Sequence, residues 1–162
     1  MSTISSNHKL LPTVVAVSLM RVLSENIPDL SLKWPNDLLI GAEKVGGILC
    51  EKFGNCSVVG IGINLVNETS INNSTNLISH GYRFDKSILL ASFLYNFDQV
   101  SALESEKIIE EFTNSDCLIG KKIYWGHDSG IAKSIDLDGS LIVESGGENL
   151  NLYSEEVHIE KY

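Results

Sequence analysis

The spacing of apolar residues predicts three helices in this chain. Between residues 11 and 24, apolar side chains recur at every third or fourth position, which is typical of a helix that packs on one face. Pro12 is tolerated there because the first turn of a helix does not need its N–H. Two more helices are predicted at 86–97, with Asp85 as the N-cap, and at 103–113. The inward positions expected in the three helices are Leu11, Val14, Val15, Leu19, Val22, Leu23, Ile88, Leu89, Phe93, Leu94, Phe97, Ile108, Ile109 and Phe112.

Short apolar runs predict a small sheet between the first two helices. The expected strands lie at 30–34, 38–40, 48–53 and 58–63, and 41–44 has the length of a hairpin turn. If these strands pair in sequence order, the polar groups near their ends converge on one side of the sheet. Those groups are Lys33, Asn36, Asp37, Lys44 and Asn64. The polar stretch 67–80 that follows is predicted to be an exposed, mobile loop.

The last part of the chain has a different pattern. Five short strand-like runs follow one another closely, and Asp138-Gly139 is a strong hairpin signal between two of them. The runs are 121–125, 130–136, 140–144, 149–153 and 157–160. This pattern predicts a small all-β unit of the kind that forms a little barrel. We therefore expect two domains, 1–117 and 118–162.

Composition and charge exclude several classes of function. The chain of 162 residues has an apolar fraction of 43%, which is typical of a globular protein, and a formal net charge of −9. That negative charge argues against sequence-independent binding of nucleic acid and against binding to an anionic membrane surface. The three cysteines contain no Cys-x-x-Cys pair, so neither a disulfide framework nor a zinc site is expected, and the four histidines have no metal-ligand spacing.

No targeting segment is expected either. Residues 1–9 are rich in serine, and they lack the apolar core of a signal peptide. The longest apolar run, 14–20, is too short to span a bilayer. These observations predict a protein of the reducing cytoplasm.

The polar residues of the predicted sheet allow more than one interpretation on their own. Asn36 and Asp37 follow Pro35, where an Asx-type turn is the more common outcome, and a lysine in a hairpin is usually just solvated. Gly46 and Gly47 change that view, because two glycines weaken a strand unless a ligand or another backbone must approach closely. The run 60–62, Gly-Ile-Gly, fits a core strand and a ligand contact equally well, and it is not a dinucleotide-binding fingerprint.

Three motifs together resemble those of biotin protein ligases. They are Lys-Trp-Pro-Asn-Asp-Leu at 33–38, Lys-Val-Gly-Gly-Ile-Leu at 44–49 and Gly-Ile-Gly-Ile-Asn at 60–64, in this order and at this spacing. The tail is similar to the SH3-like C-terminal domain of the bacterial enzymes, at 130–132, 135–141 and 154–157. The resemblance implies an α/β (α+β) catalytic domain, with a mixed sheet and packed helices, followed by an SH3-like β-barrel.

The resemblance also implies a reaction and roles for residues. The family activates biotin with Mg²⁺ and ATP to biotinyl-AMP and transfers it to a lysine of a biotin carboxyl carrier protein. On that basis Lys44 meets the biotin carboxylate and the α-phosphate, and Gly46 and Gly47 line the biotin pocket. Asp37 holds Mg²⁺ or accepts a proton from the target lysine. The nucleotide is contacted by Lys33, Asn36 and Asn64.

This chain also departs from the family pattern. The Gly-Arg-Gly-Arg-x-Gly-Arg loop that wraps biotinyl-AMP in the family does not occur in the sequence, and neither does the DNA-binding helix-turn-helix of repressor-type ligases. The expectation is therefore a catalytic domain that lacks its N-terminal part. Three hypotheses follow: a biotin ligase, a catalytically incomplete ligase fragment that binds nucleotide or a partner, and a lipoate or octanoyl ligase. The partner in the second hypothesis is a complementing N-terminal half or a second copy of the chain.

Overall fold

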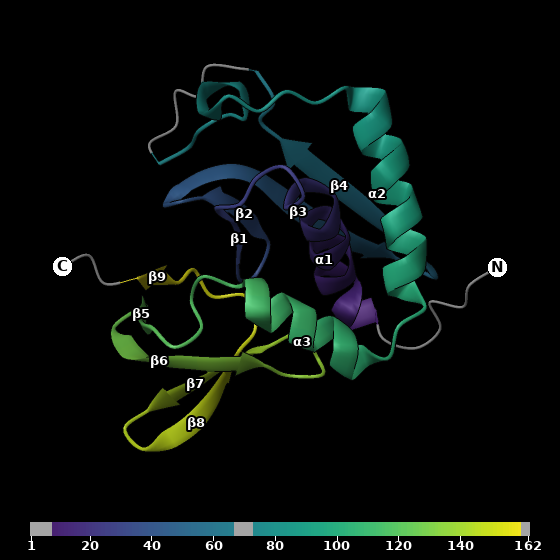
Figure 1. The fold of residues 1–162 in the computed structure, drawn as a ribbon. Coiled ribbons are helices and arrows are strands. Elements are labelled where there is room, and N and C mark those ends of the chain that lie inside the picture. Colours follow the sequence, from purple (N-terminus) through teal and green to yellow (C-terminus); the bar gives the residue numbers. More distant parts are fainter. Residues whose placement is uncertain (1–7, 67–72, 160–162) are drawn as a thin grey trace.

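The computed structural model describes residues 8–66 and 73–159, and Figure 1 shows their arrangement. They form two antiparallel sheets, three α-helices and two short 3₁₀ segments, η1 (His8–Leu10) and η2 (Ile78–His80). This confirms a mixed α/β architecture. Among the described residues, no helix has both the length and the apolar character needed to cross a bilayer.

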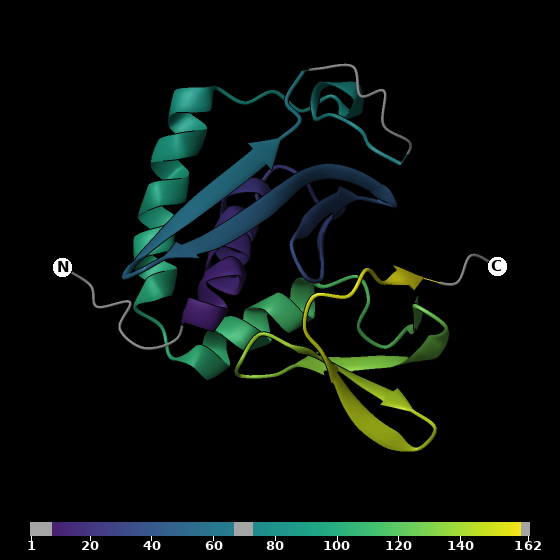
Figure 2. The ribbon, with the colours of Figure 1, turned by 180° about the vertical axis from the view of Figure 1, so that it is seen from behind.

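The first sheet has the strand order that the sequence predicts. It runs β1-β2-β3-β4, and every neighbouring pair is antiparallel, so the expectation of a mixed sheet is wrong for the described strands. The strands are β1 (Leu30–Lys33), β2 (Asp37–Ile40), β3 (Glu43–Phe53) and β4 (Cys56–Ile63). Sequential strands joined by short turns leave little topological choice, which is why the prediction succeeds. Figure 2 shows the long β3–β4 hairpin lying across helix α1.

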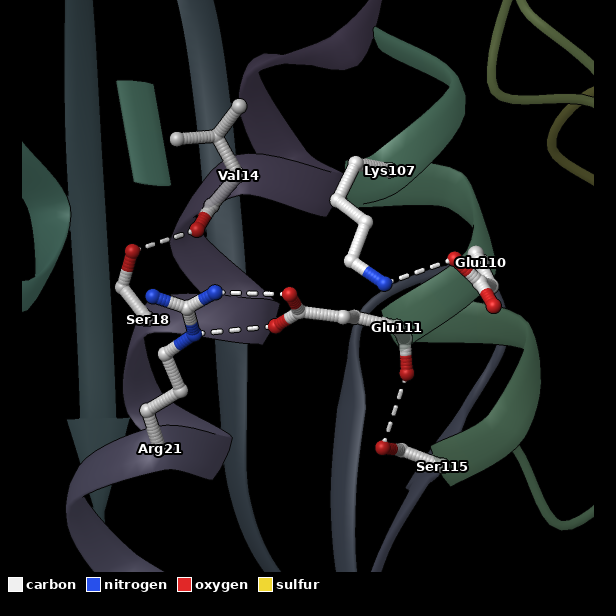
Figure 3. Close-up of polar contacts among 7 residues, drawn as sticks. All are labelled: Val14, Ser18, Arg21, Lys107, Glu110, Glu111 and Ser115. Atoms are coloured by element: carbon white, nitrogen blue, oxygen red, sulfur yellow. Dashed lines mark hydrogen bonds and ion pairs between the residues drawn. The ribbon is translucent and has the colours of Figure 1, made fainter. Parts of the chain in front are cut away.

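Helix α1 (Leu11–Leu23) is the centre of the main core. It contacts β1 and β3 on one side, and α2 (Lys86–Ser101) and α3 (Ser105–Ser115) on others. For this reason nearly every side chain of α1 is buried, beyond the single face that its periodicity predicts. The buried hydroxyl of Ser18 donates to the carbonyl oxygen of Val14 over 2.6 Å, which satisfies it inside the helix (Figure 3).

An ion pair joins α1 to α3. Arg21 donates from Nε to Oε2 of Glu111 over 2.9 Å and from Nη2 to Oε1 over 2.6 Å (Figure 3). This fork-to-fork geometry is the strong form of an arginine–carboxylate contact. The carboxylate raises the pKa of Arg21 above its ordinary value, mainly through the side-chain hydrogen bond.

The second helix exposes apolar residues that the sequence pattern placed inside. Asp85 caps α2 as predicted, since its carboxylate accepts the N–H groups of Ser87 and Ile88. Ile88 and Leu94, however, are 68% and 55% exposed, so their predicted inward placement is wrong. The α1 contact selects another face, on which Phe93 and Val100 are buried and Leu89 and Phe97 are half-buried. In α3 the expected face is confirmed, with Ile108 and Phe112 buried and Ile109 half-buried.

The predicted position of Lys44 in a turn is also wrong. The turn is only Gly41-Ala42, with Gly41 at a φ of +58°, and Lys44 already pairs with Leu39 inside β3. A two-residue hairpin favours glycine with positive φ, which leaves Glu43 and Lys44 to the strand. Gly46 and Gly47 therefore lie in the interior of β3 instead of opening it.

The second sheet contains the five predicted C-terminal strands. Its order is β8-β7-β6-β5-β9, and all pairs are antiparallel. The strands are β5 (Lys122–Trp125), β6 (Asp128–Ile135), β7 (Leu141–Ser145), β8 (Glu148–Leu152) and β9 (His158–Ile159). Helix α3 contacts β1 of the first sheet and β6 of the second, and so it lies between them (Figure 1).

The segment after β4 is less exposed than predicted. Residues 67–72 of the predicted loop lie outside the described part of the chain, as do residues 1–7 of the N-terminal stretch. Within the rest of the loop, Thr75, Asn76 and Leu77 are buried. They are buried because this segment runs beside β3, where the N–H of Lys44 donates to the carbonyl of Asn73 and the N–H of Thr75 donates back to Lys44.

Candidate functional site

The predicted polar residues meet at the start of β2 and β3, around an ion pair between Asp37 and Lys44. Asp37 is the first residue of β2, and its Oδ1 is the partner of the Lys44 ammonium. The Lys44 side chain is 45% exposed and that of Asp37 is 22% exposed. The pair is therefore partly accessible to solvent, the lysine more than the aspartate.

A β-bulge brings these two side chains to the same face. Asp37 pairs with Gly47 and Leu38 with Gly46, but Leu39 pairs with Lys44, so Val45 is an extra residue in β3. An extra residue interrupts the regular alternation of a strand and re-aims the side chains beside it. Lys44 consequently lies over Gly47 and opposite Asp37, while Val45 is fully buried.

The two glycines of β3 are required for different reasons. A Cβ at Gly46 would lie 2.7 Å from the carbonyl oxygen of Gly62 in β4, which is closer than backbone atoms allow. A Cβ at Gly47 would meet side chains instead, at 3.3 Å from Cε and 3.4 Å from Nζ of Lys44 and 3.6 Å from Oδ1 of Asp37. Gly46 permits close pairing of strands, and Gly47 keeps the space beside the ion pair open.

Asn36 ties the start of β2 to β3. Its Nδ2 donates to the carbonyl of Ile48 over 2.7 Å, and the N–H of Ile48 donates back to the carbonyl of Asn36 over 2.9 Å. The side chain therefore bonds across to the neighbouring strand instead of only to its own turn. This cross-link holds Asp37, the next residue, in register with Gly47.

Asn64 performs a similar task at the end of β4. Its backbone N–H donates to the carbonyl of Val45 over 2.8 Å, and its Nδ2 donates to the carbonyl of Thr75 over 3.0 Å. These bonds hold the segment after β4 beside the bulge.

Lys33, the last residue of β1, is the register partner of Asp37, whereas the ion-pair partner of Asp37 is Lys44.

Sequence reasoning missed one residue near this site. Asp116 follows α3 and is 8% exposed, and its two carboxylate oxygens accept the backbone N–H groups of Trp34 and Leu118, each over 2.7 Å. Burial raises the pKa of this carboxyl group to about 6, against the opposing effect of those hydrogen bonds. No local motif marks Asp116, because its partner Trp34 lies 82 positions away in the chain.

The environment of the neighbouring thiol, Cys117, disfavours its reactive form. Burial, together with the charge of Asp116, raises the pKa of Cys117 to about 11. The thiolate, which is the reactive form, is then scarce. Among the described residues, no group of three or more His, Cys, Asp or Glu side chains could enclose a metal ion.

Comparison with known proteins gives consistent matches. The family model described as the biotin/lipoate A/B protein ligase family matches residues 3–66, which include all the candidate site residues of the sheet. The bifunctional ligase/repressor BirA of Salmonella typhimurium is 30% identical over 160 residues, covering 85% of this chain and 49% of that protein. BirA of Escherichia coli is 29% identical with the same coverage. The chain thus spans about half the length of the curated relatives it matches.

Solved structures match the fold closely. A crystal structure of biotin protein ligase from Aquifex aeolicus superposes with a TM-score of 0.85 at 23% identity, covering 95% of this chain and 76% of that one. The structure of that enzyme in complex with biotin and ATP has a TM-score of 0.83 at 21% identity, with coverages of 96% and 73%. At these identities the likeness shows a shared fold.

Proposed function

This chain belongs to the biotin protein ligase family, and from that premise we propose that it catalyses ATP-dependent biotinylation. In the first step a biotin carboxylate oxygen attacks the α-phosphorus of ATP, forming biotinyl-AMP and releasing pyrophosphate. In the second step a lysine amine of a biotin carboxyl carrier protein attacks the acyl carbon, an amide bond forms, and AMP leaves. The released proton of the amine passes to a base.

The observation that carries this proposal is the Lys44–Asp37 pair beside Gly47. A carboxylate and a phosphate repel one another until a fixed cation neutralises both, and Lys44 supplies such a cation next to backbone that has no side chain. Asp37 restrains the ammonium, so less side-chain freedom is lost when the anions bind. Gly46 and Gly47 then line the pocket of the biotin carboxylate.

The nucleotide is assigned to three polar residues around the pair. Lys33 neutralises phosphate charge. Asn36 and Asn64 contact the nucleotide with the side-chain amide atoms that are not used in their hydrogen bonds to Ile48 and Thr75. A Mg²⁺ ion bound to a triphosphate takes one or two protein carboxylates as further ligands and keeps several of its waters. The single carboxylate of Asp37 is consistent with that preference. When bound, Mg²⁺ would supply neutralisation of the triphosphate charge, and the alternative role that we propose for Asp37 is to accept the proton of the target lysine.

We further propose that the chain has two units, 1–117 and 118–162, and that the second is an SH3-like barrel. Its five short antiparallel strands, on which Ile123, Ala132, Leu141 and Val143 are buried, support that assignment. The reaction is assigned to the cytoplasm, where ATP is available and Cys50, Cys56 and Cys117 remain free thiols.

A second candidate function is favoured by the edge of the first sheet. Strand β4 is one of the two edge strands of the first sheet in the described part of the chain, and on the β3–β4 hairpin Leu49, Phe53 and Val58 are 59%, 61% and 54% exposed. An exposed apolar edge is a template for a strand of another polypeptide. On this alternative the chain is an incomplete ligase that binds nucleotide and pairs with a complementing N-terminal half or with a second copy of itself.

One experiment separates the two candidates. The purified chain is mixed with biotin, Mg·ATP and a biotin carrier domain, and the carrier is analysed by mass spectrometry, with a control that lacks ATP. A mass increase of one biotinyl group that requires ATP supports the ligase. Unmodified carrier from folded chain that still binds ATP supports the incomplete module.

A further inference from the structure

The start of the candidate site is held from outside the first sheet. The backbone N–H of Trp34 donates to Oδ2 of Asp116 over 2.7 Å, and the indole Nε1–H donates to the carbonyl of Gly139 over 2.9 Å. Both acceptors belong to the last third of the chain. Trp34 is 3% exposed and lies three residues before Asp37. We infer that Asp116 and the β6–β7 turn position the segment 34–37, and that Asp116 is a positioning residue for nucleotide use by this site.

The geometry of Asp116 makes it a bridge between the two sheets. Its second oxygen, Oδ1, accepts the N–H of Leu118 over 2.7 Å, and the next residue, Cys117, donates its N–H to the carbonyl of Leu32 in β1 over 2.8 Å. Both carboxylate oxygens are therefore used by backbone donors from two different segments. A buried acceptor with two donors aimed at it keeps one position, because leaving either donor unpaired costs its desolvation.

The second contact, from the Trp34 indole to the carbonyl of Gly139, is made to a closely packed turn. Gly139 lies in the β6–β7 turn at a φ of +84°, and a Cβ there would be 3.2 Å from the carbonyl of Lys9, so the turn packs directly against the start of α1. The adjacent Asp138 accepts the N–H and hydroxyl of Ser140 over 3.1 and 2.6 Å and pairs with Lys9 at 3.5 Å. The indole of Trp34 is thus hydrogen-bonded to a turn that packs against the residues at the start of α1.

The consequence falls unequally on the two substrates of the proposed reaction. Segment 34–37 is fixed at Trp34 by the last third of the chain and at Asn36 by β3. Loosening the first point lets Asp37 shift relative to Lys44, while Gly46 and Gly47, within β3, keep their places. Of the residues assigned to the nucleotide, Asn36 lies on the held segment and Lys33 directly before it, whereas Asn64 follows β4; the residues assigned to biotin lie on β3. This kinetic part rests on the proposed function.

The test compares three variants with a matched control in the full chain. Asp116→Ala removes both acceptors, Asp116→Asn keeps one, and Trp34→Phe removes the indole donor together with part of the buried ring. Glu111→Gln, on the same α3 end, weakens the ion pair with Arg21 and touches nothing in segment 34–37. Each protein is measured by thermal unfolding, by amide hydrogen exchange of peptides covering 34–40, and by KM for Mg·ATP and for biotin.

We expect faster amide hydrogen exchange in residues 34–40 for the Asp116 and Trp34 variants. At position 116 the alanine variant should exchange faster than the asparagine variant. The KM for Mg·ATP is expected to rise about tenfold in Asp116→Ala, as the loss of one charged hydrogen bond implies, with that for biotin changed less than about twofold. Glu111→Gln lowers the melting temperature alone. Unchanged exchange in 34–40 of folded Asp116 variants, or an equal rise of both KM values, overturns the inference. If the unmutated chain has no ligase activity, the proposed function fails while hydrogen exchange still decides the positioning.

Discussion

Replacing Gly47 with alanine tests the site at its most specific point. The new Cβ would lie 3.3 Å from Cε and 3.4 Å from Nζ of Lys44, so the lysine must move by a few tenths of an ångström. A lysine side chain is flexible, and its displacement costs little folding energy. Exchange of glycine for alanine also reduces the entropy of the unfolded chain, which stabilises by about 0.4–1 kcal/mol. The free energy of unfolding should therefore change by no more than about 1 kcal/mol.

Activity should respond far more strongly than stability. A hydrogen bond to a charged group contributes about 1.5–3 kcal/mol, and its loss in the transition state lowers the rate of adenylate formation by roughly 10- to 150-fold. The displaced ammonium of Lys44 no longer meets the reacting anions. We therefore expect Gly47→Ala to form biotinyl-AMP slowly while it melts close to the temperature of the unmutated chain.

Two other glycines of the first sheet, Gly46 and Gly60, provide the controls. At Gly46 the same change places Cβ 2.7 Å from the backbone oxygen of Gly62, and forcing β3 from β4 should cost about 1–3 kcal/mol of stability. At Gly60 the new Cβ would be 3.7 Å from Leu49, an ordinary contact, so neither property should change. Thermal unfolding and mass spectrometry of biotinyl-AMP measure the three variants. A normal rate for Gly47→Ala, or a loss of stability equal to that of Gly46→Ala, would refute this account of the site.

Three further predictions concern charge and surface. Asp37→Asn should lower adenylate formation and change its dependence on Mg²⁺ concentration; identical rates at every Mg²⁺ concentration would make Asp37 a structural residue only. Because burial raises the pKa of Asp116 to about 6 from an ordinary 3.8, the folded state binds its proton more tightly than the unfolded state does. The free energy of unfolding of the unmutated chain, relative to that of Asp116→Asn, should therefore fall by up to ~3 kcal/mol between about pH 4 and pH 7. Urea unfolding of both proteins at the two pH values measures this difference. An equal change in the free energy of unfolding of both proteins would contradict the prediction. Phe53→Lys and Val58→Lys should reduce self-association in analytical ultracentrifugation without lowering stability, since both side chains are more than half exposed; association unaffected by either change would show that this edge is not the contact surface.

The sequence was most informative where neighbouring elements in the chain are neighbours in space. Pairing of sequential strands places Asp37 beside Lys44, and the helix periodicity identifies the buried face of α3. The bulge at Val45 could not be predicted from alternation, because the predicted strand begins only at Ile48, after the bulge. That bulge, and the two-residue turn before it, decide how Lys44 is aimed.

Contacts between distant segments were beyond the sequence pattern. The exposed Ile88 and Leu94 of α2 carry the same apolar signal as the buried Phe93, and only the position of α1 distinguishes them. Asp116 reads as an ordinary polar residue at a helix end, yet it holds the backbone of Trp34 across 82 positions. Burial of the segment 75–77 likewise follows from its hydrogen bonds to Lys44 and Asn64, two residues that precede it in the chain.

The most direct test of the central claim is biotinyl-AMP formation by Lys44→Ala. The change removes the cation and leaves the backbone bonds of β3 intact, and loss of the partly exposed pair with Asp37 should cost at most about 1 kcal/mol of stability. Lys52→Ala, at an exposed lysine of the same strand, is the matched control. The account predicts product from the unmutated chain and from Lys52→Ala, and none above background from folded Lys44→Ala. Product formed by Lys44→Ala at the unmutated rate would contradict it.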